Sequence, residues 1–230
     1  MSYGRAPVPV ATFDLSERWT ELLHYLYLPV VIDEHPDGPT QAAFPRRLDF
    51  AQDLVGAAMT DARHRLERTF RYVYVTARRG YATPDNPLNR PGWHCDGFGT
   101  ADLNYVWTDR WPSRYWIRKD TVTAWPLDQV PSDHLASMAH FDRFAVANFA
   151  AEENVLYRLD PFVVHTTPAV PHPGGMRSFL KVSLSDHRYN LEGNSHNHDL
   201  DYDWKMWPRA SARNAASSAL DMSDLATLVA

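Results

Sequence analysis

"FRYVYVTARR", residues 70–79, marks the point at which the character of this 230-residue chain changes. Tyr72 and Tyr74 alternate with Val73 and Val75, and a period of two is typical of a β-strand whose two faces meet different surroundings. Further short strand-like runs follow, separated by Pro and Gly: the stretch around residues 93–94, and residues 102–108, 113–117, 144–149, 154–159, 162–167 and 177–185. The second half of the chain is therefore expected to form a β core.

Helical patterns lie mainly before that point. Residues 14–28 and 49–70 space their apolar side chains at helical intervals, and a shorter helical pattern covers residues 132–141. Two helices followed by about eight short strands predict an all-β core with helices packed outside it, as in barrels, sandwiches and jelly rolls. We expect one domain, with a helical flank over about 1–69, a core over about 70–190 and an irregular C-terminal extension over about 191–230.

Composition limits the classes of function. Hydrophobic residues make up 44% of the chain, and 28 acidic against 23 basic residues give a net charge of −5. A mildly acidic chain is a poor general binder of polyanions, so nucleic acid is not the expected partner. The chain has one cysteine, no basic segment followed by an apolar run at its start, and no apolar stretch near the roughly 18 residues of a membrane span. We expect a cytoplasmic protein without a membrane segment.

The segment "RPGWHCDGFGT", residues 90–100, carries the first candidate site. His94 and Asp96 are one residue apart, so on a strand both side chains project from the same face. His165 follows an apolar run in "DPFVVHTTPAV" and is the candidate third ligand. Two His and one carboxylate, with open positions, form the ligand set of non-haem Fe(II) oxygenases. The alternatives are a surface His beside an Asp in a turn, and a core His bonded to a backbone carbonyl.

An arginine opens the next strand-like run. In "GGMRSFLKVSLS" two glycines form a turn and Arg177 begins the strand. An inward arginine near a metal is suited to bind a carboxylate through two parallel hydrogen bonds.

These elements together resemble the Fe(II)/2-oxoglutarate-dependent dioxygenase family, and the likeness covers residues 93–185. It implies a double-stranded β-helix (jelly-roll, cupin-like) core with flanking N-terminal α-helices. It implies that His94, Asp96 and His165 bind Fe(II) and that Arg177 binds the distal carboxylate of 2-oxoglutarate. It also implies O2 as co-substrate and hydroxylation of a substrate, with release of succinate and CO2.

The chain departs from the family at one position. A Ser or Thr often stands two residues after the arginine, and here that residue is Phe179. The resemblance leaves Tyr72, Tyr74 and Tyr105 as alternatives for the missing hydroxyl, and the sequence does not choose among them.

The residues around the His-x-Asp segment are candidates for the substrate pocket. We expect Trp93 and Phe98 to flank it and Asn104 to offer an amide, with Tyr105 as a further hydroxyl. A pocket of this composition suits a small molecule. The alternative is that these aromatic side chains fill the core between the sheets.

Two other functions remain open at this point. One is a cupin-like metalloenzyme that needs the three ligands but neither 2-oxoglutarate nor Arg177. The other is a non-enzymatic jelly-roll module that binds a ligand through its aromatic residues and needs no metal.

Overall fold

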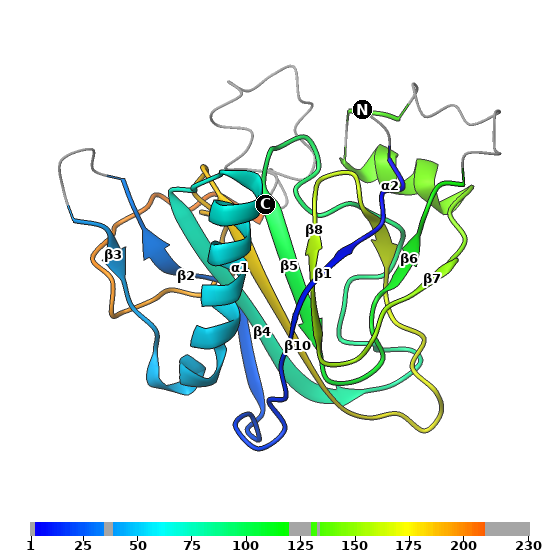
Figure 1. The fold of residues 1–230 in the computed structure, drawn as a ribbon, viewed down its shortest axis with the longest axis horizontal. Coiled ribbons are helices and arrows are strands. Elements are labelled where there is room, and N and C mark those ends of the chain that lie inside the picture. The colour runs from blue at the N-terminus through cyan, green and yellow to red at the C-terminus, as the bar shows by residue number, and fades with distance from the viewer. Residues whose placement is uncertain (1–2, 35–38, 120–129, 133, 210–230) are drawn as a thin grey trace.

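Strands dominate the structure, a computed structural model that describes residues 3–34, 39–119, 130–132 and 134–209 (Figure 1). The strands are β1 (Val8–Thr12), β2 (Leu23–Ile32), β3 (Gln41–Ala42), β4 (Tyr72–Ala82), β5 (Leu103–Thr108), β6 (Arg114–Trp116), β7 (Phe149–Ala150), β8 (Val155–Leu159), β9 (Val164–Thr166) and β10 (Gly175–Ser185). The helices are the short 3-10 helix η1 (Arg46–Ala51), α1 (Gln52–Leu66) and α2 (His134–Asp142). The expectation of a mainly β protein is confirmed.

A seven-stranded sheet forms the larger layer. Its order is β1-β8-β5-β10-β4-β2-β3, and all these pairings are antiparallel. The central strand β10 pairs with β4 along its whole length, from Gly175 opposite Ala82 to Ser185 opposite Tyr72, and with β5 on its other edge. Because backbone partners flank β10 on both sides, the side chains that it carries are held in fixed positions.

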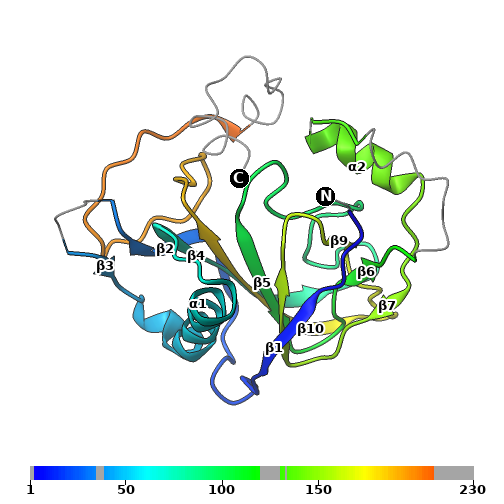
Figure 2. The ribbon, with the colours of Figure 1, turned by 45° about the horizontal axis from the view of Figure 1, so that its top comes forward.

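A three-stranded sheet, β7-β6-β9, forms the smaller layer (Figure 2). Tyr115 and Phe149 from this sheet share a hydrophobic cluster with Val106, Tyr157 and Phe179 from the larger one. The two sheets therefore pack against each other, and side chains that point between them are shielded from water.

The two faces of β10 have different neighbours. Leu180, Val182 and Leu184 belong to the main hydrophobic core, which also contains the buried face of α1. Because successive side chains on a strand point to opposite faces, the alternate residues from Arg177 to Ser183 point toward the smaller sheet. The space between the sheets thus receives polar and charged groups from β10.

The predicted helix over residues 14–28 is wrong. Residues from Leu23 onward form β2, which pairs with β4, while Leu15 and Trp19 are buried in a turn-rich segment against the main core. Helical spacing and a strand rich in Tyr, Val and Leu can share one apolar pattern, and here the pairing with β4 decides between them. The expected helical flank is therefore corrected, because β1, β2 and β3 all join the larger sheet.

The other expectations agree better with the structure. The helix expected over 49–70 is present as α1, that over 132–141 as α2, and five of the six strand-like runs after residue 101 contain a strand. The run over 144–149 is wrong for most of its length, because only Phe149 belongs to β7, and the run around 93–94 forms an isolated bridge at His94. Within residues 191–209 the structure has no named helix or strand, as expected for an irregular extension, and residues 210–230 lie outside the described part.

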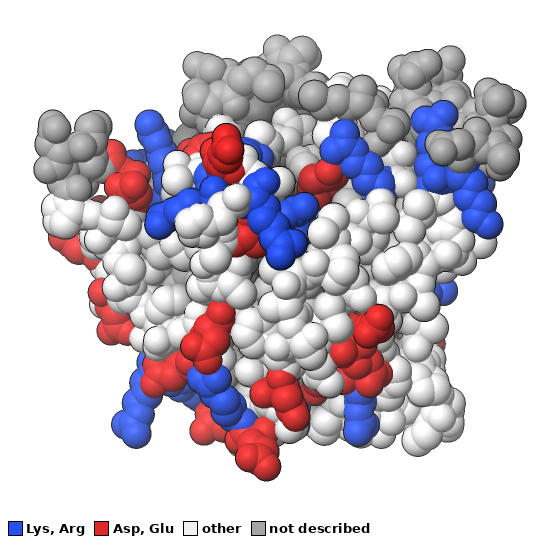
Figure 3. Space-filling model, in the orientation of Figure 1, with Lys and Arg blue, Asp and Glu red and all other residues white. Residues whose placement is uncertain are grey.

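No helix among the described residues has the length and apolar character needed to cross a membrane. On the face shown in Figure 3, basic and acidic side chains are interspersed around a largely uncharged middle band.

Candidate metal centre

Three side chains from two distant segments of the chain meet between the sheets. One potential ligand atom from each of His94, Asp96 and His165 lies within 4.8 Å of the others, and His165 Nε2 is 3.6 Å from Asp96 Oδ2. These are the three ligands expected from the sequence. The structure thus contains a cluster that could hold one metal ion.

Backbone pairing holds the two imidazoles together. His94 and His165 exchange two backbone hydrogen bonds of 2.9 Å each, which attach the His94 segment to β9. His94 Nδ1 lies 2.9 Å from the Gly92 carbonyl oxygen, and His165 Nδ1 lies 3.3 Å from that of Val163. A proton on Nδ1 donated to a carbonyl leaves Nε2 as the free nitrogen, which is the usual arrangement of metal-binding histidines.

A tight turn places Asp96 beside the histidines. Gly97 follows it with a φ of +69°, and a Cβ at this position would lie 3.2 Å from both the Asp102 Cβ and the Thr100 Oγ1. A glycine is required here because of both the backbone conformation and the close contacts. The glycines of the His-x-Asp segment are therefore part of the construction of the site.

Lys181 is a charged neighbour that the sequence interpretation missed. Its Nζ lies 3.2 Å from Asp96 Oδ2 and donates to the Tyr27 hydroxyl over 3.0 Å. Burial alone would raise the pKa of Asp96, but Lys181 and the two imidazoles outweigh it and hold that pKa well below its usual range. Burial alone would lower the pKa of Lys181, but Asp96 and Tyr27 raise it above its usual value. Both groups are charged at neutral pH.

The donor set fits a divalent ion. Burial, with His165 nearby, lowers the pKa of His94 to about 4, and burial also lowers the pKa of His165. Both imidazoles are thus neutral at neutral pH, which is the state that binds metal, and Asp96 supplies one negative charge. Because ligand bonds are about 2 Å long, two donors on one ion are about 4 Å apart or less. Only a small inward movement of the side chains is needed to reach that distance.

Arg177 lies on the same face of β10 as Lys181 and is fully buried, at 0% exposure. Its Nη1 donates to Asn89 Oδ1 over 2.6 Å and to the Pro87 carbonyl over 3.3 Å, and its Nε donates to the carbonyls of Arg110 and Trp111. All these partners are uncharged, and within the described part of the chain Nη2 has no hydrogen-bond partner. Burial lowers the pKa of Arg177 to about 10, so it remains a cation at neutral pH.

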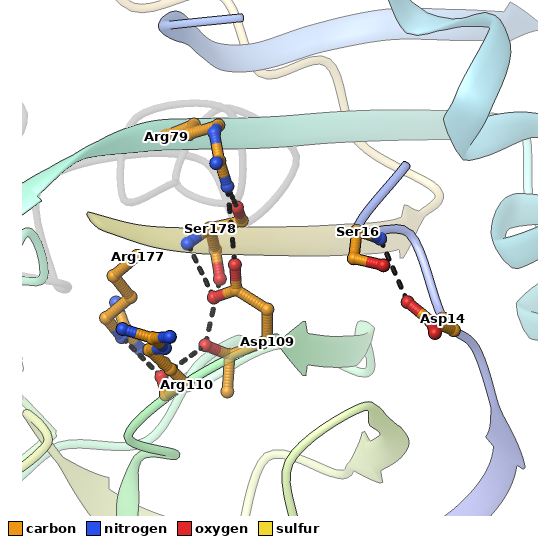
Figure 4. A network of polar contacts seen from close by, with 8 residues as sticks. Asp14, Ser16, Arg79, Asp109, Arg110, Arg177 and Ser178 are labelled. Carbon is orange, nitrogen blue, oxygen red and sulfur yellow. Dashed lines mark hydrogen bonds and ion pairs between the residues drawn. The ribbon is translucent and has the colours of Figure 1, made fainter. Parts of the chain in front are cut away.

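The loop that follows β5 fixes the position of this guanidinium. Asp109 accepts a 2.7 Å hydrogen bond from the Ser178 backbone and lies 3.4 Å from Arg79 Nη1, and Thr108 donates to the Arg110 carbonyl (Figure 4). The Arg110 carbonyl, which accepts from Arg177, is therefore held by a residue that also contacts β10 at Ser178. This frame orients the guanidinium. Asp109 raises the pKa of Arg177 and partly offsets burial, but no ion pair or hydrogen bond joins the two among the described residues.

Tyr115 is a second residue that the sequence interpretation did not select. It lies on β6 with 1% exposure, and its ring centroid is 5.9 Å from that of His165. Burial raises the pKa of its phenol far above the usual value, Asp96 raises it further, and Arg177 opposes the increase. The phenol of Tyr115 thus senses both the carboxylate of the cluster and the buried guanidinium.

The structure does not bring Tyr74 or Tyr105 to Arg177. The Tyr74 hydroxyl donates to the His187 carbonyl over 2.9 Å, and its ring stacks on Tyr189 at 4.2 Å. The Tyr105 side chain belongs to the main core on the α1 side of the sheet, where its hydroxyl donates to Asp61 over 3.0 Å. The presence of a tyrosine in a strand-like run does not show which face of the sheet its side chain occupies. That face depends on how the strand pairs with its neighbours.

The expected pocket residues divide into two groups. Phe98 packs in a hydrophobic cluster with Trp116 and Phe141 next to α2, and Trp93 packs against that cluster. Asn104 instead faces the space between the sheets, where its Oδ1 accepts a 2.6 Å hydrogen bond from Ser183. Arg177, Lys181 and Ser183 form a polar row on this face of β10. Of the expected pocket residues, Asn104 is the one that contacts this row.

Phe98→Ala should lower the free energy of unfolding by about 3–5 kcal/mol, because it removes a side chain that is 7% exposed from a packed cluster. Chemical denaturation followed by fluorescence measures the loss. Leu22→Ala, at a position that is 67% exposed, is the matched control and should have little effect. A loss below about 1 kcal/mol for Phe98→Ala would mean that this side chain lines an open pocket rather than the core.

The chain matches no family model, no curated protein and no solved structure in comparisons with known proteins. Function must therefore be argued from the site itself.

Proposed function

We propose that this protein is an Fe(II)- and 2-oxoglutarate-dependent oxygenase that hydroxylates a small molecule. Its ligand set is the first support, since two histidines and one carboxylate with open positions are typical of non-haem Fe(II) oxygenases. When bound, Fe(II), 2-oxoglutarate and O2 would supply the oxidising chemistry, with release of succinate and CO2. The protein would hold the metal through His94, Asp96 and His165 and would keep bulk water away.

The observation that carries the proposal is the buried Arg177. The hydrogen-bond partners of this guanidinium are all uncharged, its Nη2 has none in the described part of the chain, and Asp109 only partly offsets the effect of burial on its pKa. Such a group is unfavourable in a protein interior unless an anion joins it. Arg177 lies four residues from Lys181 on one face of β10, and Lys181 contacts Asp96. The pKa of the Tyr115 phenol responds to both Asp96 and Arg177, which supports a dicarboxylic acid that binds the metal with one end and Arg177 with the other. Tyr115 supplies the most suitable hydroxyl.

The order of the strands supports a jelly-roll form of the core. After β4 in the larger sheet, His94 pairs in the smaller layer, β5 returns to the larger, and β6 and β7 lie in the smaller. Then β8, β9 and β10 lie in the larger, smaller and larger sheets in turn. Chains that alternate between two facing antiparallel sheets in this way are typical of double-sheet jelly rolls. We infer the double-stranded β-helix from this alternation.

A small molecule is the substrate class that agrees with the surface charge. The net charge is −5, and the described part of the face in Figure 3 shows no continuous basic stripe of the kind that binds nucleic acid.

Sequential binding tests the proposal. Calorimetric titration with Mn(II) should show one site per chain, and 2-oxoglutarate should then bind the Mn(II)-loaded protein and not the metal-free protein. With Fe(II), compound pools should be screened for substrate-dependent release of succinate. Metal binding without 2-oxoglutarate binding would favour the cupin-like metalloenzyme, and no metal binding at all would favour a non-enzymatic ligand-binding module.

A further inference from the structure

Beyond Lys181, β10 carries a second polar group toward the same space. Ser183 is the next residue of the strand that points to this face, and it lies opposite Asn104 on β5. Asn104 Oδ1 accepts from Ser183, so the amide is oriented with its Nδ2 away from that bond. Asn104 is 2% exposed, and its Nδ2 has no hydrogen-bond partner in the described part of the chain.

Asn104 also touches the segment that carries the metal ligands. Its Nδ2 would lie 3.4 Å from a Cβ placed on Gly97, the residue after Asp96. The unpartnered amide is therefore beside the cluster. Along β10 the order is Arg177, Lys181 and Ser183, so Asn104, opposite Ser183, lies at the end of the row away from Arg177. The two ends of this polar row are suited to two different ligands.

Metal binding would change the electrostatic surroundings of the Lys181 ammonium. A divalent ion on Asp96 neutralises the charge that attracts the ammonium in the metal-free protein. Lys181, with 9% of its side chain exposed, would then keep the Tyr27 hydroxyl as its main partner. A buried ammonium without an anion is unfavourable, so the loaded site favours a ligand with a negative charge.

We propose that Lys181 and the Asn104 amide anchor a carboxylate group of the primary substrate, on the side of the metal cluster away from Arg177. This inference rests on the proposed function. One ammonium and one neutral amide match a single negative charge. The nearby Asp102, whose Oδ2 accepts a 2.6 Å hydrogen bond from Tyr189, disfavours a dianion such as phosphate.

Two aromatic rings lie beside Lys181. The rings of Tyr27 and Tyr189 meet edge to face with their centroids 5.1 Å apart, and the Lys181 ammonium lies 4.7 Å from the Tyr27 ring centroid. Aromatic rings beside a cation and an amide suit a small carboxylic acid with an apolar skeleton.

Binding of matched probes to Zn(II)-loaded protein, saturated with 2-oxoglutarate, tests the anchor without turnover. The probes are propionate, benzoate and phenylacetate, each paired with its primary amide, and ligand-observed NMR gives the affinities. We expect at least one acid to bind about tenfold or more tightly than its amide, since truncating a buried charge partner has effects of this size. Lys181→Met should remove the preference, whereas the exposed-site control Lys205→Met should keep it.

A second variant guards against misfolding of the first. Asn104→Asp keeps the Oδ1 acceptor for Ser183 but replaces the free amide donor with a negative charge, so it should abolish acid binding. Equal affinity for acids and amides in the natural protein, or a preference that survives Lys181→Met, would overturn the anchor. So would a Lys181→Met variant that loses 2-oxoglutarate affinity while keeping its acid preference, because Lys181 would then serve the co-substrate.

The affinity for 2-oxoglutarate itself is measured separately, on the Zn(II)-loaded protein without probes. Normal 2-oxoglutarate binding with no acid preference rejects the anchor and leaves the oxygenase proposal standing. A Lys181-dependent acid preference without any 2-oxoglutarate binding supports the anchor and rejects the oxygenase. Loss of both rejects both.

Discussion

His94→Ala should weaken binding of Mn(II) by more than about 100-fold and abolish metal-dependent turnover. The variant leaves two donors, Asp96 and His165, and even changes to the groups that orient metal ligands cost about 10–100-fold in affinity. Calorimetric titration of Mn(II) measures the change. His64→Ala, at an exposed position on α1, is the control and should bind Mn(II) as the natural protein does.

The fold should survive this substitution. The segment is attached to β9 by backbone hydrogen bonds between His94 and His165, and alanine retains both the N–H and the C=O that form them. A normal thermal melt together with lost metal binding would therefore locate the effect at the imidazole. Unchanged Mn(II) affinity in the folded variant would show that this cluster is not the metal centre.

The β core was predictable because its signal is local. The alternation of Tyr72 to Val75 reports one strand with two different faces, and the structure forms β4 there, with the Val side chains in the α1 core and the Tyr side chains opposite. Local patterns fail where two structures fit one sequence. Residues 23–28 satisfy helical spacing, and only the partner strand β4, distant in sequence, makes them β2.

The candidate metal cluster was predictable for a related reason. The spacing of His94 and Asp96 predicted that their side chains lie together, although Asp96 reaches the histidines through a turn and not along a strand. His165 could be paired with them through its apolar strand. Lys181 had a usable signal as well, since it stands four residues after Arg177 and shares its face in an alternating strand. Tyr27 had none, because its place depends on β2, and its positive φ of 47° lies at an irregularity in the pairing of β2 with β4.

Arg177→Lys should lower the affinity of the Mn(II)-loaded protein for 2-oxoglutarate by about 10–100-fold, the equivalent of a charge-assisted hydrogen bond of about 1.5–3 kcal/mol. Lysine keeps the positive charge, but it replaces a planar guanidinium that has five N–H donors with a compact ammonium that has three. It cannot donate to Asn89 and to the carbonyls of Arg110 and Trp111 while it also presents two parallel donors to a carboxylate. The loss of 2-oxoglutarate affinity thus tests the donor geometry of residue 177 and not its charge.

Mn(II) affinity separates this effect from damage to the metal centre. Arg177 has no contact with the three ligands among the hydrogen bonds and ion pairs of the described residues, so Arg177→Lys should bind Mn(II) normally. Arg47→Lys, at an exposed arginine paired with Glu21, is the matched control and should leave both affinities unchanged. If the Arg177→Lys protein melts normally, binds Mn(II) and still binds 2-oxoglutarate as the natural protein does, then the buried guanidinium does not hold the acid. A metalloenzyme without 2-oxoglutarate would then be favoured, because the oxygenase proposal depends on Arg177 Nη2 as the donor to the acid.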